Sequence, residues 1–318
     1  MPQFKGSGRV RILLVGCSGF VGRALVPQLL AAGHQLVLIS RSSAPLAAVQ
    51  SPKLQRLQAD PAQGATWQLP AVQEALATSE AVINLAGEPI AEKRWSEAHR
   101  ALLSSSRIHT TRALVAAMQA LPDDKRPQTL ISGSAIGYYG TSETGRFSET
   151  SPAGSDFLAG LCQAWEKEAE AASSFARVVI LRIGIVLGAD GGALGKMLPV
   201  FRMGFGGPIG NGQQWMSWIT RHDLCRLIGE ALSTPAYQGT YNAVAPAPCS
   251  MANFAAALGQ ALGRPSLLPV PAPILQLLLG DGAKVVLEGQ QVLPERLQQQ
   301  GFVFEDAELS AALARATT

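Results

Sequence analysis

The feature that most constrains the fold is a glycine-rich segment near the start of the chain, at residues 15–22 (Val-Gly-Cys-Ser-Gly-Phe-Val-Gly), in which every third residue from Gly16 is a glycine. It follows the apolar stretch 10–15, which is typical of a buried strand, and it opens a helical pattern with apolar residues at Leu25 and Leu29. Strand, glycine turn and helix in this order predict a dinucleotide-binding loop, because glycines let the backbone approach a pyrophosphate and the helix N-terminus attracts its charge. The residues expected to hold the cofactor here are Gly16, Ser18, Gly19, Phe20, Val21 and Gly22.

The end of the second predicted strand, at residues 35–39, indicates which dinucleotide is bound. An NAD-preferring protein carries an Asp or Glu there, where the carboxylate binds the ribose. This chain has Ser40-Arg41-Ser42-Ser43 instead, and a guanidinium with neighbouring hydroxyls suits a 2′-phosphate that a carboxylate would repel. We therefore expect NADP(H) to be held by Ser40, Arg41 and Ser42. The alternative is that Arg41 is a solvated residue at the strand end.

Composition and charge argue against several classes of protein. The 318 residues are 47% hydrophobic and 15% charged, enough to bury the core of one large α/β domain or of a domain with a smaller lobe. The net charge of +3 comes from 26 basic and 23 acidic residues without a dominant block, so no nucleic-acid partner is expected. The longest apolar tract, 267–279, is short and interrupted by prolines, so no membrane span is expected.

The four cysteines and four histidines are scattered, without the spacing of a zinc site or a disulfide framework, so no metal is expected. The sequence enters its first strand without a basic and apolar leader, which favours a reducing, cytoplasmic location. The expected partner is a small-molecule substrate, and the sequence leaves monomer and homodimer open.

Predicted strands and helices alternate through the first half of the chain. Such alternation predicts the α/β class, with a Rossmann-type, doubly wound parallel sheet. The strand-like stretches after the second are 54–59, 81–85, 129–132 and 178–183, and the longest helical stretches are 97–120 and 156–172.

Glycine- and proline-rich segments break this pattern after residue 187. We therefore expect residues 1–187 and 213–244 to form an NADP-binding Rossmann domain. Residues 188–212 and 245–318 are expected to form a smaller, irregular lobe that binds the substrate over the carboxyl ends of the strands.

Further motifs occur in order along the whole chain. They are Asp60 after the third strand, Asn84-Leu85-Ala86-Gly87 after the fourth, Ser134-Ala135-x-x-Tyr138 after the fifth, Leu181-Arg182 on the sixth, and Trp218-Ile219 before Asp223. With the glycine run, this series resembles the extended branch of the short-chain dehydrogenase/reductase superfamily. Segments such as Ser105-Ser106-Arg107 and Val292-Leu293-Pro294 are similar to its atypical NADP-binding "epimerase family", related to nucleotide-sugar epimerases. The resemblance implies additional cofactor contacts at Asp60, Leu85, Ala86, Gly87, Arg107 and Ser132.

Arg107 stands where related enzymes usually carry an asparagine. A buried arginine must be paired, and a carboxylate of Glu88, Glu92 or Glu149 could supply the partner. In the functional interpretation, Arg107 binds an anionic substrate group or a cofactor phosphate.

One departure from the resemblance concerns catalysis. Active extended-branch enzymes carry Tyr-x-x-x-Lys on the helix after the fifth strand, where the lysine lowers the pKa of the phenol for proton exchange with the substrate. When the helix is aligned on Glu166, Leu158 falls at the tyrosine position and Cys162 at the lysine position. The helix holds no tyrosine, and its first lysine, Lys167, lies beyond Glu166. The usual dyad is therefore expected to be absent.

Ser134, Tyr138 and Tyr139 are the remaining catalytic candidates. Ser134 matches the serine that binds a substrate oxygen in the superfamily, and either tyrosine could serve as a relocated proton donor. In the alternative, Tyr138 fills the cleft wall and Tyr139 stacks on a ligand or packs beneath the loop.

Two functions from different classes remain open. The chain is an NADP(H)-dependent oxidoreductase or epimerase with an unidentified carbonyl, alcohol or nucleotide-sugar substrate, or it is a non-catalytic NADP(H)-binding sensor or partner-binding protein. Nucleotide-sugar binding, with the nucleotide base against the strand that carries Trp215 and Trp218, is a third possibility.

Overall fold

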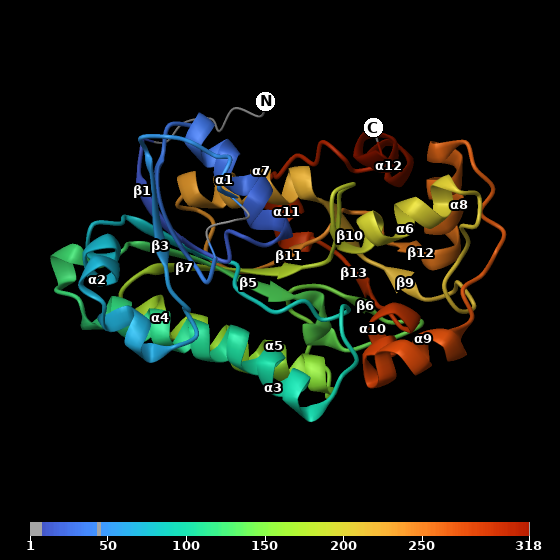
Figure 1. Ribbon diagram of the computed structural model, residues 1–318, viewed down its shortest axis with the longest axis horizontal. Helices are drawn as coiled ribbons and strands as arrows, with labels where there is room; N and C mark the ends of the chain where they lie inside the picture. The colour runs from blue at the N-terminus through green and yellow to red at the C-terminus, as the bar shows by residue number, and fades with distance from the viewer. Residues whose placement is uncertain (1–7, 43–45, 318) are drawn as a thin grey trace.

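The computed structural model describes residues 8–42 and 46–317. Within these residues, seven strands form one parallel sheet in the order β11-β7-β5-β4-β1-β2-β3 (Figure 1), which confirms the predicted Rossmann-type fold. The strands of this sheet are β1 (Arg11–Val15), β2 (Gln35–Ser40), β3 (Leu54–Gln58), β4 (Ala81–Asn84), β5 (Thr129–Ala135), β7 (Arg177–Ile183) and β11 (Gly239–Ala243). β1 lies between β2 and β4, so the chain reverses its direction across the sheet there, and ligands of such sheets bind at this switch point.

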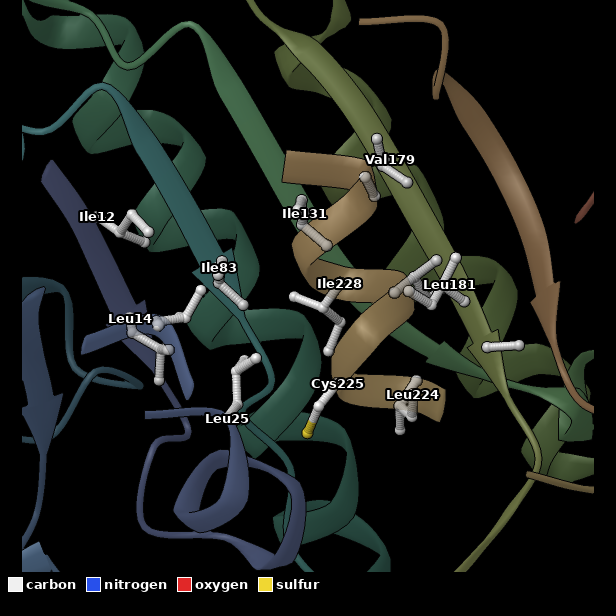
Figure 2. Packing of buried hydrophobic residues seen from close by; sticks show 14 of the residues in the cluster. Ile12, Leu14, Leu25, Ile83, Ile131, Val179, Leu181, Leu224, Cys225 and Ile228 are labelled. Carbon is white, nitrogen blue, oxygen red and sulfur yellow. The ribbon is translucent and has the colours of Figure 1, made fainter. Parts of the chain in front are cut away.

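Helices cover both faces of the sheet. α1 (Phe20–Ala31) and α7 (Arg221–Ser233) pack on one face, where Leu25, Leu224 and Ile228 meet Leu14 and Ile83 of the strands (Figure 2). The opposite face is covered by α2 (Pro70–Ala77), α4 (Thr110–Ala120) and α5 (Phe157–Glu170). Each fully buried aliphatic side chain in these layers contributes about 1.5–3 kcal/mol to the free energy of folding. The packed layers therefore hold the sheet, and with it the strand ends that carry the site, in a fixed position.

The helix predicted over residues 97–120 is continuous but changes its geometry in the middle. α3 (Glu97–Ser104) begins with Ser96 as its N-cap, and α4 begins at Thr110. Between them, η3 (Ser105–His109) is a turn of π-helix, a feature that often occurs at functional sites. Arg107 lies in this turn.

The C-terminal part of the chain builds a separate cluster of buried side chains. α6 (Gly192–Arg202), α8 (Met251–Leu262) and α12 (Leu309–Thr317) enclose it together with Trp218. Leu297 and Phe302 instead pack into the core beneath the sheet, so the last part of the chain contributes to both cores.

Shorter elements complete the fold. The small strands are β6 (Arg146–Phe147), β8 (Ile185–Leu187), β9 (Trp215–Met216), β10 (Trp218–Thr220), β12 (Cys249–Ser250) and β13 (Gln291–Val292). The remaining helical segments are η2 (Gly64–Gln68), η4 (Asp123–Lys125), η5 (Ile136–Tyr139), η6 (Ala171–Ser174), α9 (Ala272–Leu279), η7 (Gly280–Ala283), α10 (Lys284–Leu287) and α11 (Glu295–Gln299). Across the part of the chain that the structure describes, none of the helices has the length and apolar character needed to span a bilayer.

Candidate cofactor and active site

The glycine loop between β1 and α1 has the geometry that its sequence predicts. Gly16 has a φ of +81°, and a Cβ there would overlap the carbonyl of Leu85 on the neighbouring β4 loop. A Cβ at Gly22 would lie 2.6 Å from the Cα of Cys17, so α1 can approach the loop only with glycine at this position. These two glycines set the tight turn and the close packing of helix on strand.

The start of α1 supplies a positive helix end beside this loop. Gly19 is the N-cap residue, and among the described residues no side chain caps the first turn, which contains Phe20 and Val21. The N–H groups of a first helical turn have no partner within the helix and bind anions. Ser18 is half-buried and Gly19 is exposed, so the loop is accessible to a ligand.

The residues after β2 present a cation beside the loop. The side chain of Arg41 is 67% exposed, and its Nη2 lies 3.8 Å from a carboxylate oxygen of Glu88. Ser40 donates a hydrogen bond of 2.6 Å to the carbonyl of Ser42 and thereby shapes the turn. Ser43 lies outside the described residues.

The other expected cofactor contacts also follow strand ends. Asp60 accepts a hydrogen bond from the Ala62 N–H, so one of its oxygens shapes the turn after β3. Leu85, Ala86 and Gly87 follow β4, and the Ala86 N–H donates to Asn84. Ser132 is fully buried on β5.

Arg107 reaches over this edge from the π-helical turn. The expected pairing with a carboxylate of Glu88, Glu92 or Glu149 is wrong, because Nη2 donates to the main-chain carbonyl of Glu88 at 2.9 Å and Nη1 to that of Leu103. A Cβ at Gly87 would lie 3.0 Å from the Arg107 guanidinium, which also lies 5.4 Å from the ring centroid of Trp165. Burial lowers the pKa of Arg107. The guanidinium is therefore held by carbonyls and an aromatic ring, and none of the carboxylates that the structure describes is bonded to it.

Ser134 is engaged in a buried polar cluster. Its hydroxyl donates a 2.6 Å hydrogen bond to Oε1 of Glu166, which also accepts from Arg182. Sequence reasoning used Glu166 only as a marker of helix register and missed this pairing, because no local signal in the sequence connects a carboxylate on a helix with an arginine on a distant strand. In this arrangement, the Ser134 proton points at a carboxylate and not toward an incoming substrate oxygen.

The two tyrosines differ in environment. Tyr139 is 3% exposed; its hydroxyl donates to Asn242 at 2.7 Å and accepts from Arg182 at 2.9 Å. Burial raises the pKa of Tyr139 to about 12, against the opposing effects of Arg182 and Asn242. Tyr138 is half-buried, with its ring centroid 3.3 Å from the Arg182 guanidinium carbon. Tyr139 is therefore a packed, protonated residue, and of the two tyrosines only Tyr138 is partly exposed.

Leu158 and Cys162 of α5 face the loop after β5. A Cβ at Gly137 would lie 3.3 Å from Leu158 Cβ and 3.9 Å from Cys162 Sγ. Burial raises the pKa of the Cys162 thiol to about 12, Glu166 raises it further, and the nearby Arg107 charge acts in the opposite direction. The thiol is therefore neutral at physiological pH. In the described part of the chain, no three His, Cys, Asp or Glu side chains are grouped to hold a metal ion.

Comparison with known proteins agrees with this fold. The model of the NAD dependent epimerase/dehydratase family matches residues 12–244. The chain belongs to this family. Residues 270–316 match a second family model, a domain of unknown function (DUF1731).

Relatives cover nearly the whole chain. Epimerase family protein SDR39U1 homolog, chloroplastic, from Arabidopsis thaliana is 44% identical over 93% of this chain and 84% of its own length. Epimerase family protein SDR39U1 from Homo sapiens is 37% identical over 96% of this chain and 98% of its own. The crystal structure of human SDR39U1 (isoform 2) with NADPH superposes with a TM-score of 0.83 at 35% identity, covering 96% of this chain and 99% of that one. This epimerase-family chain therefore has an NAD(P)-binding Rossmann fold.

Proposed function

We propose that this epimerase-family protein binds NADP(H) and acts through the presence of the bound cofactor, without the Tyr-Lys proton transfer of its enzymatic relatives. The glycine loop fits a pyrophosphate, because a side chain at Gly16 or Gly22 would overlap backbone atoms and α1 presents an uncapped N-terminus. Arg41 supplies an exposed guanidinium for the 2′-phosphate. The human relative with bound NADPH supports the same choice of cofactor.

The observation that carries the second half of the proposal is the 2.6 Å hydrogen bond from Ser134 to Glu166. A serine that donates to a carboxylate cannot donate the same proton to a substrate carbonyl. Leu158 and Cys162 stand at the expected positions of the tyrosine and lysine, and neither is an acid or a base at neutral pH. NADP(H) would supply hydride chemistry when bound, but these residues provide no proton relay for it.

We assign Arg107 a cofactor-binding role in this arrangement. Its guanidinium faces Gly87 and lies near Cys162, so it brings a positive charge to the region where a lysine at position 162 would act. Hydrogen bonds to two carbonyls hold the guanidinium in place. It would contact the ribose or pyrophosphate oxygens of the cofactor.

Phe20 provides a route from the cofactor to the C-terminal lobe. Its ring packs against the loop before α6, where a Cβ at Gly188 or Gly191 would lie 2.8 Å or 2.7 Å from ring atoms. Its backbone belongs to the first turn of α1, which is the turn proposed to bind the pyrophosphate. If the contact between Phe20 and this loop has more than one conformation, a cofactor that binds one of them more tightly shifts the protein toward that conformation.

Calorimetric titration with NADPH and NADH tests the cofactor assignment. We expect NADPH to bind at least about tenfold more tightly than NADH, and Arg41→Ala to remove this preference by weakening NADPH alone, since a charge-assisted contact is worth about 1.5–3 kcal/mol. Arg264→Ala, an exposed arginine in the C-terminal lobe, is the matched control. Equal affinities for the two cofactors would refute the assignment.

Two measurements on the NADPH-loaded protein then test the mode of action. We expect no oxidation at 340 nm with carbonyl compounds or nucleotide sugars, and slower hydrogen exchange in residues 188–202 once NADPH is bound. Phe20→Ala should keep most of the NADPH affinity but lose this protection. Unchanged exchange in residues 188–202 would exclude the proposed route.

A reductase that uses Tyr138 is the second candidate, favoured by one observation. Tyr138 is the half-buried member of the tyrosine pair, and the Arg182 guanidinium lies against its ring. Turnover of any carbonyl substrate that is abolished in Tyr138→Phe, with NADPH affinity unchanged, would establish this candidate in place of the first.

A further inference from the structure

Exposed apolar side chains gather on one part of the C-terminal lobe. Of the eleven large apolar side chains that are exposed in the described part of the chain, eight come from residues 200–205 and 267–278. Leu267 is 82% exposed and Leu277 is 74% exposed. We call these eight side chains the apolar face: Val200, Met203, Phe205, Leu267, Leu268, Ile274, Leu277 and Leu278. Exposed apolar surface that is concentrated in this way marks an interaction site.

The two segments of the apolar face lie side by side. The Leu268 N–H donates to the carbonyl of Gly206 at 3.1 Å, and Val270 forms a β-bridge with Ile209. α9 begins directly after this contact, at Ala272, and it lies at the same end of the molecule as α6 and α8 (Figure 1). The apolar side chains therefore belong to one end of the C-terminal lobe.

α9 has the composition of a buried helix without the burial. Gln276 is its only polar residue, and none of its eight residues is buried. A helix that is apolar all round is normally covered by protein or by lipid. The part of the chain that the structure describes does not provide this cover.

The lobe that carries the apolar face also lacks acidic residues. Although the chain has 23 Asp and Glu residues, none of them occurs in residues 191–222 or in residues 231–280. These two segments contain the whole apolar face. A surface without carboxylates is not repelled by a negatively charged partner.

Cations accompany the apolar face. Arg202 and Arg264 are exposed and lie within three residues of Met203 and Leu267, and neither forms an ion pair with a carboxylate of the described residues. Lys196 of the same lobe is different, because it pairs with an acidic residue outside these segments. The two arginines therefore remain available to a negatively charged surface.

We propose that the apolar face binds the surface of an anionic lipid bilayer. The leucines of α9 would enter the boundary between headgroups and acyl chains, and Arg202 and Arg264 would contact lipid phosphates. A second copy of the chain fits this face less well, because the arginines of both copies would meet in an interface without carboxylates to pair them. The proposal does not depend on the NADP(H) site.

The test is co-sedimentation of the full chain with vesicles of two compositions. We expect binding to vesicles of phosphatidylcholine mixed with phosphatidylglycerol, and at least about tenfold weaker binding to vesicles of phosphatidylcholine alone. Added salt should weaken the binding to the anionic vesicles. Absence of binding, or equal binding to the two compositions, would overturn the proposal.

Two pairs of variants locate the binding surface. Leu277→Gln with Leu278→Gln should weaken binding to the anionic vesicles at least about tenfold, because it removes apolar surface from α9. The matched control is Leu69→Gln with Val303→Gln, which changes two exposed apolar side chains outside the apolar face and should bind as the unchanged protein does. Circular dichroism shows whether each variant is folded. Undiminished binding by the folded variant of α9 would exclude the apolar face.

The arginines are tested in the same way. Arg202→Gln with Arg264→Gln should remove the preference for phosphatidylglycerol, whereas Lys53→Gln with Lys125→Gln, at exposed positions elsewhere, should retain it. Light scattering of the protein without lipid tests the second copy as the occupant. A dimer that dissociates in Leu277→Gln with Leu278→Gln would show that another copy covers the apolar face and would overturn the lipid assignment.

Discussion

Arg182 donates from Nε and Nη2 to the two carboxylate oxygens of Glu166, at 2.9 and 2.8 Å, and each residue is only 5% exposed. Burial alone would lower the pKa of Arg182, but the Glu166 carboxylate raises it above its ordinary value. The pair joins β7 to α5 and takes the Ser134 hydroxyl as a further donor. Ser134, which matches the serine that binds a substrate oxygen in the superfamily, is therefore part of an internal ion network.

Removing one member of this pair should be strongly destabilising. We expect Glu166→Gln to lower the free energy of unfolding by about 3–5 kcal/mol, because the Arg182 charge stays buried without its counterion. Glu166→Gln with Arg182→Met should cost less than the sum of the single changes, as urea denaturation of the four proteins would show. Additive losses would mean that the two side chains do not stabilise each other.

Tyr139 gives a prediction for alkaline pH. Its pKa is raised from about 10 in the unfolded chain to about 12 in the folded protein, so the folded state favours the protonated phenol. The stabilisation is complete below pH 10 and is lost as the pH rises toward 12.

Tyr139→Phe isolates this effect, because the buried thiols titrate equally in both proteins. At pH 8 the variant should be less stable by about 1–2 kcal/mol, owing to the lost hydrogen bonds with Asn242 and Arg182. At pH 11 the difference in unfolding free energy should shrink by about 1 kcal/mol. A difference that is constant with pH would contradict the assignment.

Alanine substitutions at Gly16 and Gly19 should affect folding and cofactor binding differently. Gly16→Ala should lower the free energy of unfolding by more than about 2 kcal/mol, because it forces a side chain into a left-handed backbone against Leu85. Gly19 has an ordinary φ of −73°, and a Cβ there lies 3.3 Å from the Gly16 carbonyl oxygen. Gly19→Ala should therefore cost less than about 1 kcal/mol of stability and weaken NADPH at least about tenfold. Intact NADPH affinity in Gly19→Ala would count against pyrophosphate binding at this turn.

The glycine loop and the sheet were predictable because their signals are local. Gly16 and Gly22 lie only six residues apart, and the apolar strands follow one another in order, so spacing alone specifies the strand-turn-helix unit. The π-helical turn that contains Arg107 has no such local signal, and the contacts that it makes with Gly87 and Trp165 appear only in the folded structure.

The polar cluster of the site could not be predicted for a related reason. Ser134, Glu166 and Arg182 come from three elements, and each is an ordinary residue of its strand or helix. The register of β5 against β7 sets Ser134 beside Arg182, and the packing of α5 against these strands brings Glu166 to both. Likewise, the pairing of Arg107 with main-chain carbonyls carries no mark in the side-chain sequence.

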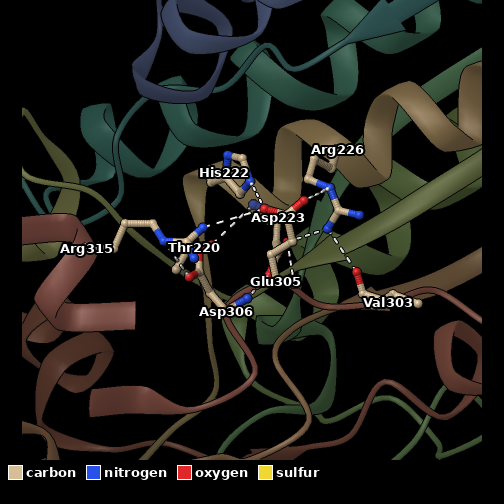
Figure 3. A network of polar contacts seen from close by, with 8 residues as sticks. All are labelled: Thr220, His222, Asp223, Arg226, Val303, Glu305, Asp306 and Arg315. Carbon is tan, nitrogen blue, oxygen red and sulfur yellow. Dashed lines mark hydrogen bonds and ion pairs between the residues drawn. The ribbon is translucent and has the colours of Figure 1, made fainter. Parts of the chain in front are cut away.

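Asp223 should control the attachment of the C-terminal segment. Its buried carboxylate accepts the N–H groups of Glu305 and Asp306 and a 2.8 Å hydrogen bond from Arg226 (Figure 3). Asp223→Asn replaces one acceptor oxygen by a donor, so we expect a loss of about 2–3 kcal/mol and faster hydrogen exchange in residues 303–317. Asp123→Asn, at an exposed surface pair with Arg126, is the control. Unchanged exchange in the variant would show that the hydrogen bonds of Asp223 do not hold this segment.

Arg107 and Cys162 should be energetically coupled, because the two side chains lie close together. A lysine at position 162 would bring a second positive charge to the region that the Arg107 guanidinium occupies. Cys162→Lys places a second cation beside the desolvated Arg107 guanidinium, and we expect it to lower the unfolding free energy by about 3 kcal/mol or more. Cys162→Met, which adds similar length without charge, should cost less.

Arg107→Asn alone should lose the contacts with the Glu88 carbonyl and Trp165 and weaken NADPH. In the double variant Arg107→Asn with Cys162→Lys, the lysine restores one cation to the same region, so stability and NADPH affinity should exceed those expected from adding the single effects. Denaturation and calorimetry of the four proteins measure this coupling, expected at about 1–3 kcal/mol. Simple additivity of the two effects would mean that the Arg107 charge does not replace the charge of a lysine at position 162. Any effect of Arg107→Asn on NADPH affinity would then come from direct contacts between Arg107 and the cofactor.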